Sequence, residues 1–74
     1  MVIETKLLPN YQEFAGGTVA WSLPDGSVDT RHIYLVANVC DGNMTLHVES
    51  KFQDEKPPPE NTMFTITRKK YARK

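Results

Sequence analysis

The stretch that decides the fold is IYLVANVCDGNMTLHV, residues 33–48. Apolar and β-branched residues alternate with polar ones on either side of Asp41-Gly42, and this period of two is typical of strands. Asp-Gly between two such runs is a strong signal for a hairpin with a two-residue loop. The turn therefore pairs Cys40 with Asn43 and predicts two long antiparallel strands.

Counting back from that turn predicts the register of the whole hairpin, because successive side chains of a strand point to opposite faces. The pairs expected on one face are Val39–Met44, Ala37–Leu46, Leu35–Val48 and Ile33–Ser50. Tyr34, Val36 and His47 are then expected together on the opposite face. Since Tyr34 and Val36 are apolar, that face is expected to be partly covered or to serve as a contact surface.

Turn residues and alternation predict five strands in all, over residues 2–8, 17–23, 28–40, 44–52 and 62–69. LPDGS (residues 23–27) indicates a hairpin whose three-residue loop pairs Leu23 with Ser27. This register places Asp29 and Arg31 on the core-facing side, where we expect them beyond the core edge near the hairpin tip. The proline-containing residues 53–61 are expected to form a stiff crossover connection.

The fold class predicted is all-β: a small single-domain five-stranded antiparallel meander, curled into a barrel or half-open sandwich. Seventy-four residues leave room for one domain. We divide the chain into a β domain over residues 1–67 and a basic carboxyl-terminal tail over residues 68–74. The tail holds five basic residues and no acid, whereas the rest holds nine acids and four bases, for a net charge near −5.

The expected cellular location follows from three features of the sequence: a single cysteine, an amino terminus unlike a signal peptide, and short apolar runs. Cys40 is the only cysteine, so no intramolecular disulfide can form and a reducing, cytoplasmic location is expected. Residues 1–6 contain an early acid and no continuous apolar run, so they do not resemble a signal peptide. The longest apolar run, residues 33–37, is far too short to span a bilayer, and no membrane association is expected.

The candidate reactive residues do not converge in the predicted register. His32 lies four residues along the strand from the row of His47, roughly 13 Å away, and Cys40 lies at the other end of the sheet. No metal site, no cofactor and no cysteine–histidine pair are therefore expected. Glu49 has no second carboxylate beside it for acid–base chemistry, and no phosphate-binding glycine motif occurs. The sequence favours a protein that is not an enzyme.

Two surfaces are candidates for binding a partner: the basic tail and the face formed by Tyr34, Val36 and His47. The tail residues expected to take part are Arg68, Lys69, Lys70, Tyr71, Arg73 and Lys74. The hypothesis is a small inhibitor or adaptor, of a size that viruses and mobile elements encode, which binds a protein with an acidic surface. The alternative is a small nucleic-acid-binding protein that uses the basic tail and the aromatic sheet face, because cations suit phosphates and aromatic side chains can stack on bases. Pairing of edge strands with a second copy is also open.

Overall fold

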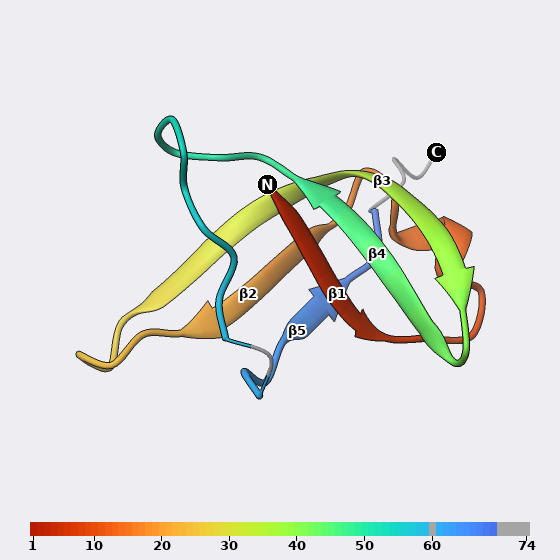
Figure 1. The fold of residues 1–74 in the computed structure, drawn as a ribbon, viewed down its shortest axis with the longest axis horizontal. Coiled ribbons are helices and arrows are strands. Elements are labelled where there is room, and N and C mark those ends of the chain that lie inside the picture. Colours follow the sequence, from red (N-terminus) through yellow and green to blue (C-terminus); the bar gives the residue numbers. More distant parts are fainter. Residues whose placement is uncertain (60, 70–74) are drawn as a thin grey trace, which may run out of the picture.

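A computed structural model of the chain describes residues 1–59 and 61–69, and it confirms an all-β domain of five antiparallel strands (Figure 1). The third predicted strand has the predicted bounds, whereas the other four strands are shorter than predicted. A short 3₁₀ helix, η1, lies in the loop between the first two strands. The elements are β1 (Val2–Lys6), η1 (Tyr11–Phe14), β2 (Thr18–Ser22), β3 (Val28–Cys40), β4 (Asn43–Val48) and β5 (Thr65–Thr67).

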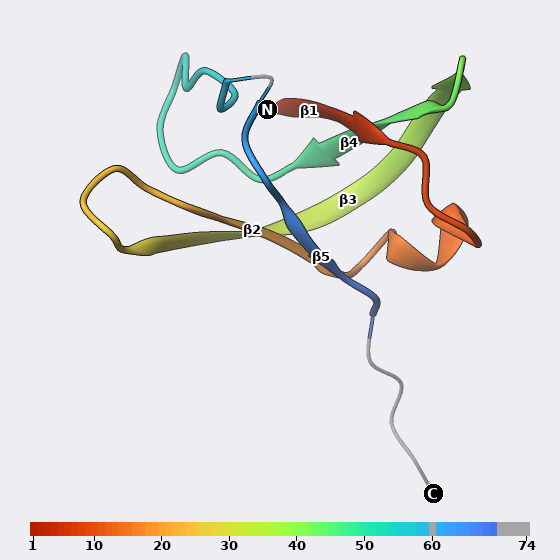
Figure 2. The ribbon, with the colours of Figure 1, turned by 90° about the horizontal axis from the view of Figure 1, so that it is seen from below.

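The strands lie in the order β1-β4-β3-β2-β5 in one curled sheet that resembles a half-barrel. β2, β3 and β4 follow one another through hairpins, while β1 pairs with β4 and β5 pairs with β2. Figure 2 shows the two layers that result, with β1 and β4 above β2 and β5. The long β3 belongs to both layers, as expected for the strand at which a small sheet bends.

The β2–β3 hairpin has the predicted register. The Leu23 amide donates to the carbonyl of Ser27 at 2.8 Å, and Trp21 lies opposite Asp29. Gly26 adopts a φ of 90°, a left-handed conformation that costs glycine nothing. The three-residue loop is thus confirmed, and with it the placement of Asp29 on the core-facing side of β3.

The β3–β4 register is correct at the turn and wrong farther along. Cys40 pairs with Asn43 as predicted, but Ala37 lies opposite Thr45 rather than Leu46. The cause is an extra residue on β3 between Ala37 and Cys40, where Asn38 takes a left-handed φ of 52°. A bulge of this kind shifts the pairing by one residue.

A second irregularity lies between Ile33 and Leu35, where β3 again carries one residue more than β4. Ile33 therefore lies opposite Val48 instead of Ser50. Because a one-residue shift reverses the faces, Leu35 points away from the core, and Val36 is half-buried on the core side opposite Leu46. The prediction that Val36 shares the outer face with Tyr34 is wrong for this reason.

The core lies between the two layers. Trp21 from β2 and Phe64, which precedes β5, meet edge to face with ring centroids 5.7 Å apart. This geometry is favourable for aromatic pairs and adds to the burial of their area. Among the described residues, the buried apolar side chains are Ile3, Phe14, Val19, Trp21, Ile33, Met44, Leu46 and Val48.

Gly17 allows β5 to approach the start of β2. A Cβ atom placed on Gly17 would lie 1.9 Å from the carbonyl oxygen of Thr67, a contact that backbone atoms cannot relieve without a shift of the strand. β5 contributes only three residues to the sheet, so its pairing with β2 has few other contacts to compensate.

We expect Gly17→Ala to destabilise the domain by about 2 kcal/mol or more, because it forces the backbone of β5 away from β2. The matched control is Gly42→Ala, where the new methyl group meets open space and only the left-handed φ of 77° is strained, at a cost of about 1 kcal/mol. Urea unfolding measures both variants, and hydrogen exchange should show selective loss of protection in β5 for the first. Equal costs for the two variants would contradict the close approach.

Candidate binding surfaces

The bulge near Tyr34 turns two consecutive large side chains of β3 outward. Tyr34 is 67% exposed and Leu35 is 51% exposed. His47 on β4 lies opposite both Leu35 on β3 and Val2 on β1, so these three side chains form a row across three strands. Directly opposed side chains on one face have Cβ atoms about 5 Å apart. We call Val2, Tyr34, Leu35 and His47 the outer-face patch.

A polar pair borders the outer-face patch. The Nδ1 atom of His32 lies 2.9 Å from Oε1 of Glu49, and the His32 amide donates to the same oxygen at 2.8 Å. The hydrogen bond from the His32 backbone, followed by the contact with its side chain, lowers the pKa of Glu49. Since His32 lies two residues before Tyr34 on β3, the patch has a charged boundary at this end.

Of the three residues predicted for this face, Tyr34 and His47 lie on the outside and Val36 does not. Leu35 and Val2 take its place, and the sequence analysis missed both. Val2 and His47 are 45 residues apart in the sequence (47 − 2), and the local pattern holds no signal that β1 pairs with β4.

The first residues of the predicted tail contact η1. Nη1 of Arg68 lies 3.2 Å from Oε1 of Glu13, and its guanidinium lies 5.7 Å from the centre of the Phe14 ring. The side chain of Lys69 passes close to Gly16. Lys70, Tyr71, Arg73 and Lys74, also predicted to bind a partner, lie outside the described residues. The basic segment therefore starts from a defined place beside η1.

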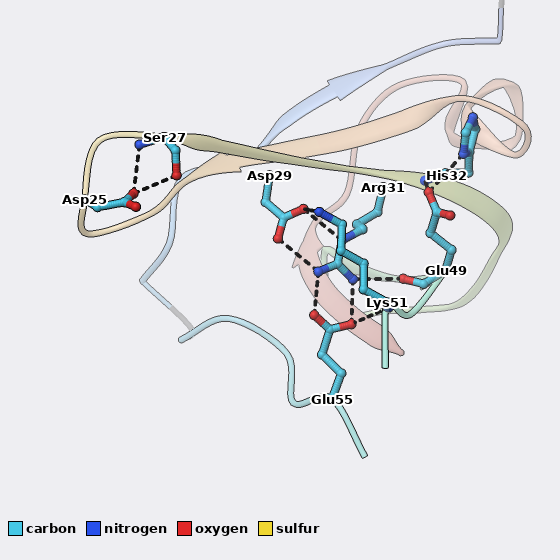
Figure 3. Close-up of polar contacts among 8 residues, drawn as sticks. All are labelled: Asp25, Ser27, Asp29, Arg31, His32, Glu49, Lys51 and Glu55. Carbon is cyan, nitrogen blue, oxygen red and sulfur yellow. Dashed lines mark hydrogen bonds and ion pairs between the residues drawn. The ribbon is translucent and has the colours of Figure 1, made fainter. Parts of the chain in front are cut away.

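Arg31 is buried, with 2% of its surface exposed, and the prediction that it lies beyond the core edge is wrong. Nε and Nη2 donate to the two carboxylate oxygens of Asp29, each at 2.9 Å. Nη1 donates to Oε1 of Glu55 at 2.6 Å, and Nη2 donates to Oε2 of the same residue (Figure 3). The guanidinium also lies 5.5 Å from the centre of the Trp21 ring. Glu55 comes from the crossover loop, which covers this end of the core.

The network keeps both carboxylates charged. The hydrogen bonds from Arg31 lower the pKa of Asp29 to about 2 and that of Glu55 to about 2. The same bonds, with that to Glu55 first, raise the pKa of Arg31. Lys51 completes the cluster, with Nζ 3.0 Å from Asp29 Oδ1 and its amide donating to Glu55 Oε1 at 2.9 Å. Two acids and two bases thus balance one another.

A cavity of about 480 Å³ lies beside this network, between the tip of the β2–β3 hairpin and the crossover loop. Its size falls within the range of small-molecule and side-chain sites. We call it the hairpin pocket. Its lining residues are Trp21, Ser22, Leu23, Pro24, Asp29, Glu55, Lys56, Pro58, Pro59 and Thr62.

Two kinds of feature are absent from the described part of the chain: a cluster of metal-binding side chains and a helix that could span a membrane. Over residues 1–59 and 61–69, no three histidine, cysteine or acidic side chains gather where they could hold a metal ion. Within the same residues, no helix has the length and apolarity needed to cross a membrane. Comparisons with protein-family models, with curated proteins and with solved structures find no match to this chain. The outer-face patch, the basic segment and the hairpin pocket are the features of this chain that bear on its function.

We expect Arg31→Met to cost about 3 kcal/mol at pH 7, because it leaves two carboxylates at the core edge without their cation. Both carboxyl groups have a folded-state pKa below their ordinary value, so their contribution to stability is present above about pH 5 and is lost as the pH falls towards 2. The unfolding free energy of the parent chain should therefore fall across this range, and the deficit of Arg31→Met should shrink.

Urea unfolding followed by circular dichroism at several pH values measures this difference. Arg68→Met is the matched control: it removes an exposed arginine that pairs with Glu13, and it should cost under about 1 kcal/mol. A deficit for Arg31→Met that stays constant from pH 7 to pH 2 would contradict the assigned role of the network.

Proposed function

We propose that this protein is a non-enzymatic binding module that acts as an inhibitor or adaptor by contacting another protein through the outer-face patch. The supporting observation is the bulge in β3, which presents Tyr34 and Leu35 side by side on the outside of the sheet. Large apolar side chains that gather on a soluble surface are typical of interaction sites. Tyrosine is enriched in such interfaces because it adds polar specificity to apolar area.

The position of the outer-face patch suits recognition of a protein. The patch lies on three paired strands, so its side chains are held by backbone hydrogen bonds and by the core beneath them. His47 at its centre and the His32–Glu49 pair at its border supply donors and acceptors that select a partner. Apolar contacts at the centre with polar groups at the rim are the usual anatomy of a protein–protein interface.

The basic segment over residues 68–74 supports a partner with an acidic surface. It carries five positive charges. Long-range attraction of this kind accelerates encounter and orients the partner before close contact forms. We assign the activity to the cytoplasm, because a single cysteine suits a reducing compartment. The edge strands β1 and β5 each pair with one neighbour, so strand pairing with a partner or a second copy belongs to the same proposal.

Binding of single-stranded nucleic acid is the second candidate function. The observation that favours it is the sequence RKKYARK (residues 68–74), in which an aromatic residue lies among cations. The remaining chain, with a net charge near −5, opposes it by repelling phosphates. Protein binding is therefore the better-supported proposal.

The outer-face patch is tested by a matched pair of substitutions on β3. Leu35→Asp should reduce affinity for the native partner at least tenfold, because a charge enters the apolar centre of the contact. Val28→Asp makes the same kind of change at a residue of the same strand that is 64% exposed and outside the patch, and it should leave affinity unchanged. The measurement is quantitative capture from nuclease-treated extract of the source cell, followed by titration with the purified partner. Equal effects of the two variants would contradict the proposal.

The second candidate is tested by titrating the full chain with single-stranded oligonucleotides at increasing salt. Binding through the five cations should weaken with a slope of about 0.7 per phosphate contacted. If no oligonucleotide binds even at low salt, the nucleic-acid function is excluded, while the protein-binding proposal is unaffected.

A further inference from the structure

We propose that the free edge of β1 binds an extended segment of a partner protein as an added antiparallel strand, with an acidic residue opposite Lys6 and a basic residue opposite Glu4. This inference rests on the proposed function as a binding module, and it names the edge and the chemistry of the segment that pairs there. Three observations support it: unpaired backbone groups along β1, a groove beside them, and two charges without partners.

The backbone of β1 offers hydrogen bonds on the side that faces away from β4. Met1 and Val48 form a bonded pair, in which each amino or amide nitrogen donates to the carbonyl of the other at 3.0 and 2.9 Å. Bonded and non-bonded positions alternate along an antiparallel pair, so the backbone groups of Val2, Glu4 and Lys6 point away from β4. Among the described residues, these groups have no hydrogen-bond partner.

A groove runs along this edge. Three adjoining cavities of about 300, 410 and 570 Å³ lie between β1 and residues 57–59 and 62–66, and Phe64 lines all three. We call these cavities together the β1 groove. In Figure 1, the crossover loop passes the side of β1 that faces away from β4. The row of cavities therefore provides space for an extended segment between β1 and a wall that contains three prolines.

The floor of the β1 groove is apolar. Phe64 and Ile66 pack against the core but are only partly buried, and Met63 beside them is 88% exposed. The side chains of an added strand alternate between the outer face and this floor. Those that point inward would cover Phe64 and Ile66, and removal of apolar surface from water favours binding. We therefore expect apolar residues in the segment at the positions that face the floor.

Two charges of opposite sign lie on this edge. The side chains of Glu4 and Lys6 are exposed, and among the described residues neither has an ion pair or a hydrogen bond. Their neighbours across β4, Thr45 and Asn43, are uncharged. Charged side chains on an edge strand deter indiscriminate pairing, whereas opposite charges directly across from one another favour it. In antiparallel pairing, the segment therefore reads acidic, apolar, basic in chain order.

Strand β1 of a second copy carries its charges in this same order, yet it suits the groove less well. Its middle residue is Thr5, which would bring a hydroxyl group to an apolar floor. It would also bring its own β4 and crossover loop to a groove that already has a wall beside β1. An extended segment with no neighbouring strand meets neither obstacle, so we assign the edge to a partner protein.

The probe is an acetylated, amidated peptide with the sequence TEVRVVT, and its control, TRVEVVT, exchanges the two charges at constant composition. At saturation, the first peptide should slow hydrogen exchange of the Val2, Glu4 and Lys6 amides of the full chain by about tenfold or more, because each amide gains a partner. The Ile3 and Thr5 amides, which face β4, are internal references. The control peptide should bind about fivefold more weakly. Equal responses of the edge amides to the two peptides would overturn the proposal.

Methylation of the peptide backbone tests whether the contact is a strand. A methyl group on the nitrogen of the peptide's glutamate or arginine removes a hydrogen bond to β1 and should abolish binding, since these residues lie in bonded positions opposite Lys6 and Glu4. A methyl group on the nitrogen of the valine between them lies on the far side of the segment and should leave binding in place. Equal loss of binding for the two kinds of methylated peptide would contradict strand pairing.

Exchange of the charges on β1 provides a matched pair of variants. Glu4→Lys combined with Lys6→Glu keeps the composition and the net charge, and it alters only exposed side chains, so the domain should fold as the parent does. This variant should prefer TRVEVVT to TEVRVVT, the reverse of the parent. Glu13→Arg combined with Arg68→Glu exchanges the charges of an ion pair outside the groove and should keep the parent's preference. An unchanged preference in the first variant would overturn the roles assigned to its two charges.

The two proposals fail separately. Leu35→Asp lies in the outer-face patch, two strands away from the edge, and should leave the affinity for TEVRVVT unchanged. Loss of peptide binding in this variant would assign the peptide to the outer-face patch and overturn the inference about β1. Protection of the edge amides that rises with the concentration of the free chain would assign the edge to a second copy and also overturn it. Absence of peptide binding in the parent would do the same, while the contact through the outer-face patch would still stand on its own test.

Discussion

The buried guanidinium of Arg31 is the interaction on which the rest of the structure depends. It binds Asp29 on its own strand and joins that strand to two groups farther along the chain: the backbone carbonyl of Glu49, 18 residues away, and Glu55 in the crossover loop, 24 residues away. A domain of this size has a thin core, so the loop that covers one end of it has to be held by something other than apolar area. The planar guanidinium makes two hydrogen bonds to each carboxylate and one to the carbonyl, whereas a lysine ammonium has only three donors. The crossover loop, the Trp21 ring and the side of the hairpin pocket that Asp29 and Glu55 line are therefore all arranged around one side chain.

The bulges of β3 are the second constraint, and they act on the surface rather than on the core. A strand of 13 residues that belongs to both layers must bend, and extra residues allow the bend without losing pairing on either side. Each extra residue also exchanges the faces of the side chains that follow. The same device that closes the half-barrel thus moves Val36 into the core and turns Leu35 outward, so the shape of the sheet and the composition of the outer-face patch have a common cause.

The sequence pattern was sufficient to predict the features that depend only on residues near one another in the chain. The bounds of β3, the loop after Leu23 and the pairing of Cys40 with Asn43 all depend on turn chemistry and alternation, and all were predicted. The register failed at Asn38, because asparagine in a left-handed conformation is uncommon and nothing in the alternation marks it. The burial of Arg31 was missed for a different reason: its partner Glu55 lies 24 residues away in a polar loop, and a charged residue is assigned to the core only when its partner is known.

The segregation of charge between the tail and the rest of the chain is weaker in three dimensions than in sequence. Asp29 and Glu55 are balanced by Arg31 and Lys51, Glu13 pairs with Arg68, and Glu49 contacts His32. Four of the nine acids therefore have basic partners within the described residues, and salt screens the field of the others beyond about 8 to 10 Å. A diffuse attraction between an acidic body and a basic segment cannot then supply much affinity or any selectivity. Selectivity has to come from contacts at short range, such as those of the outer-face patch, where paired strands fix the positions of the side chains.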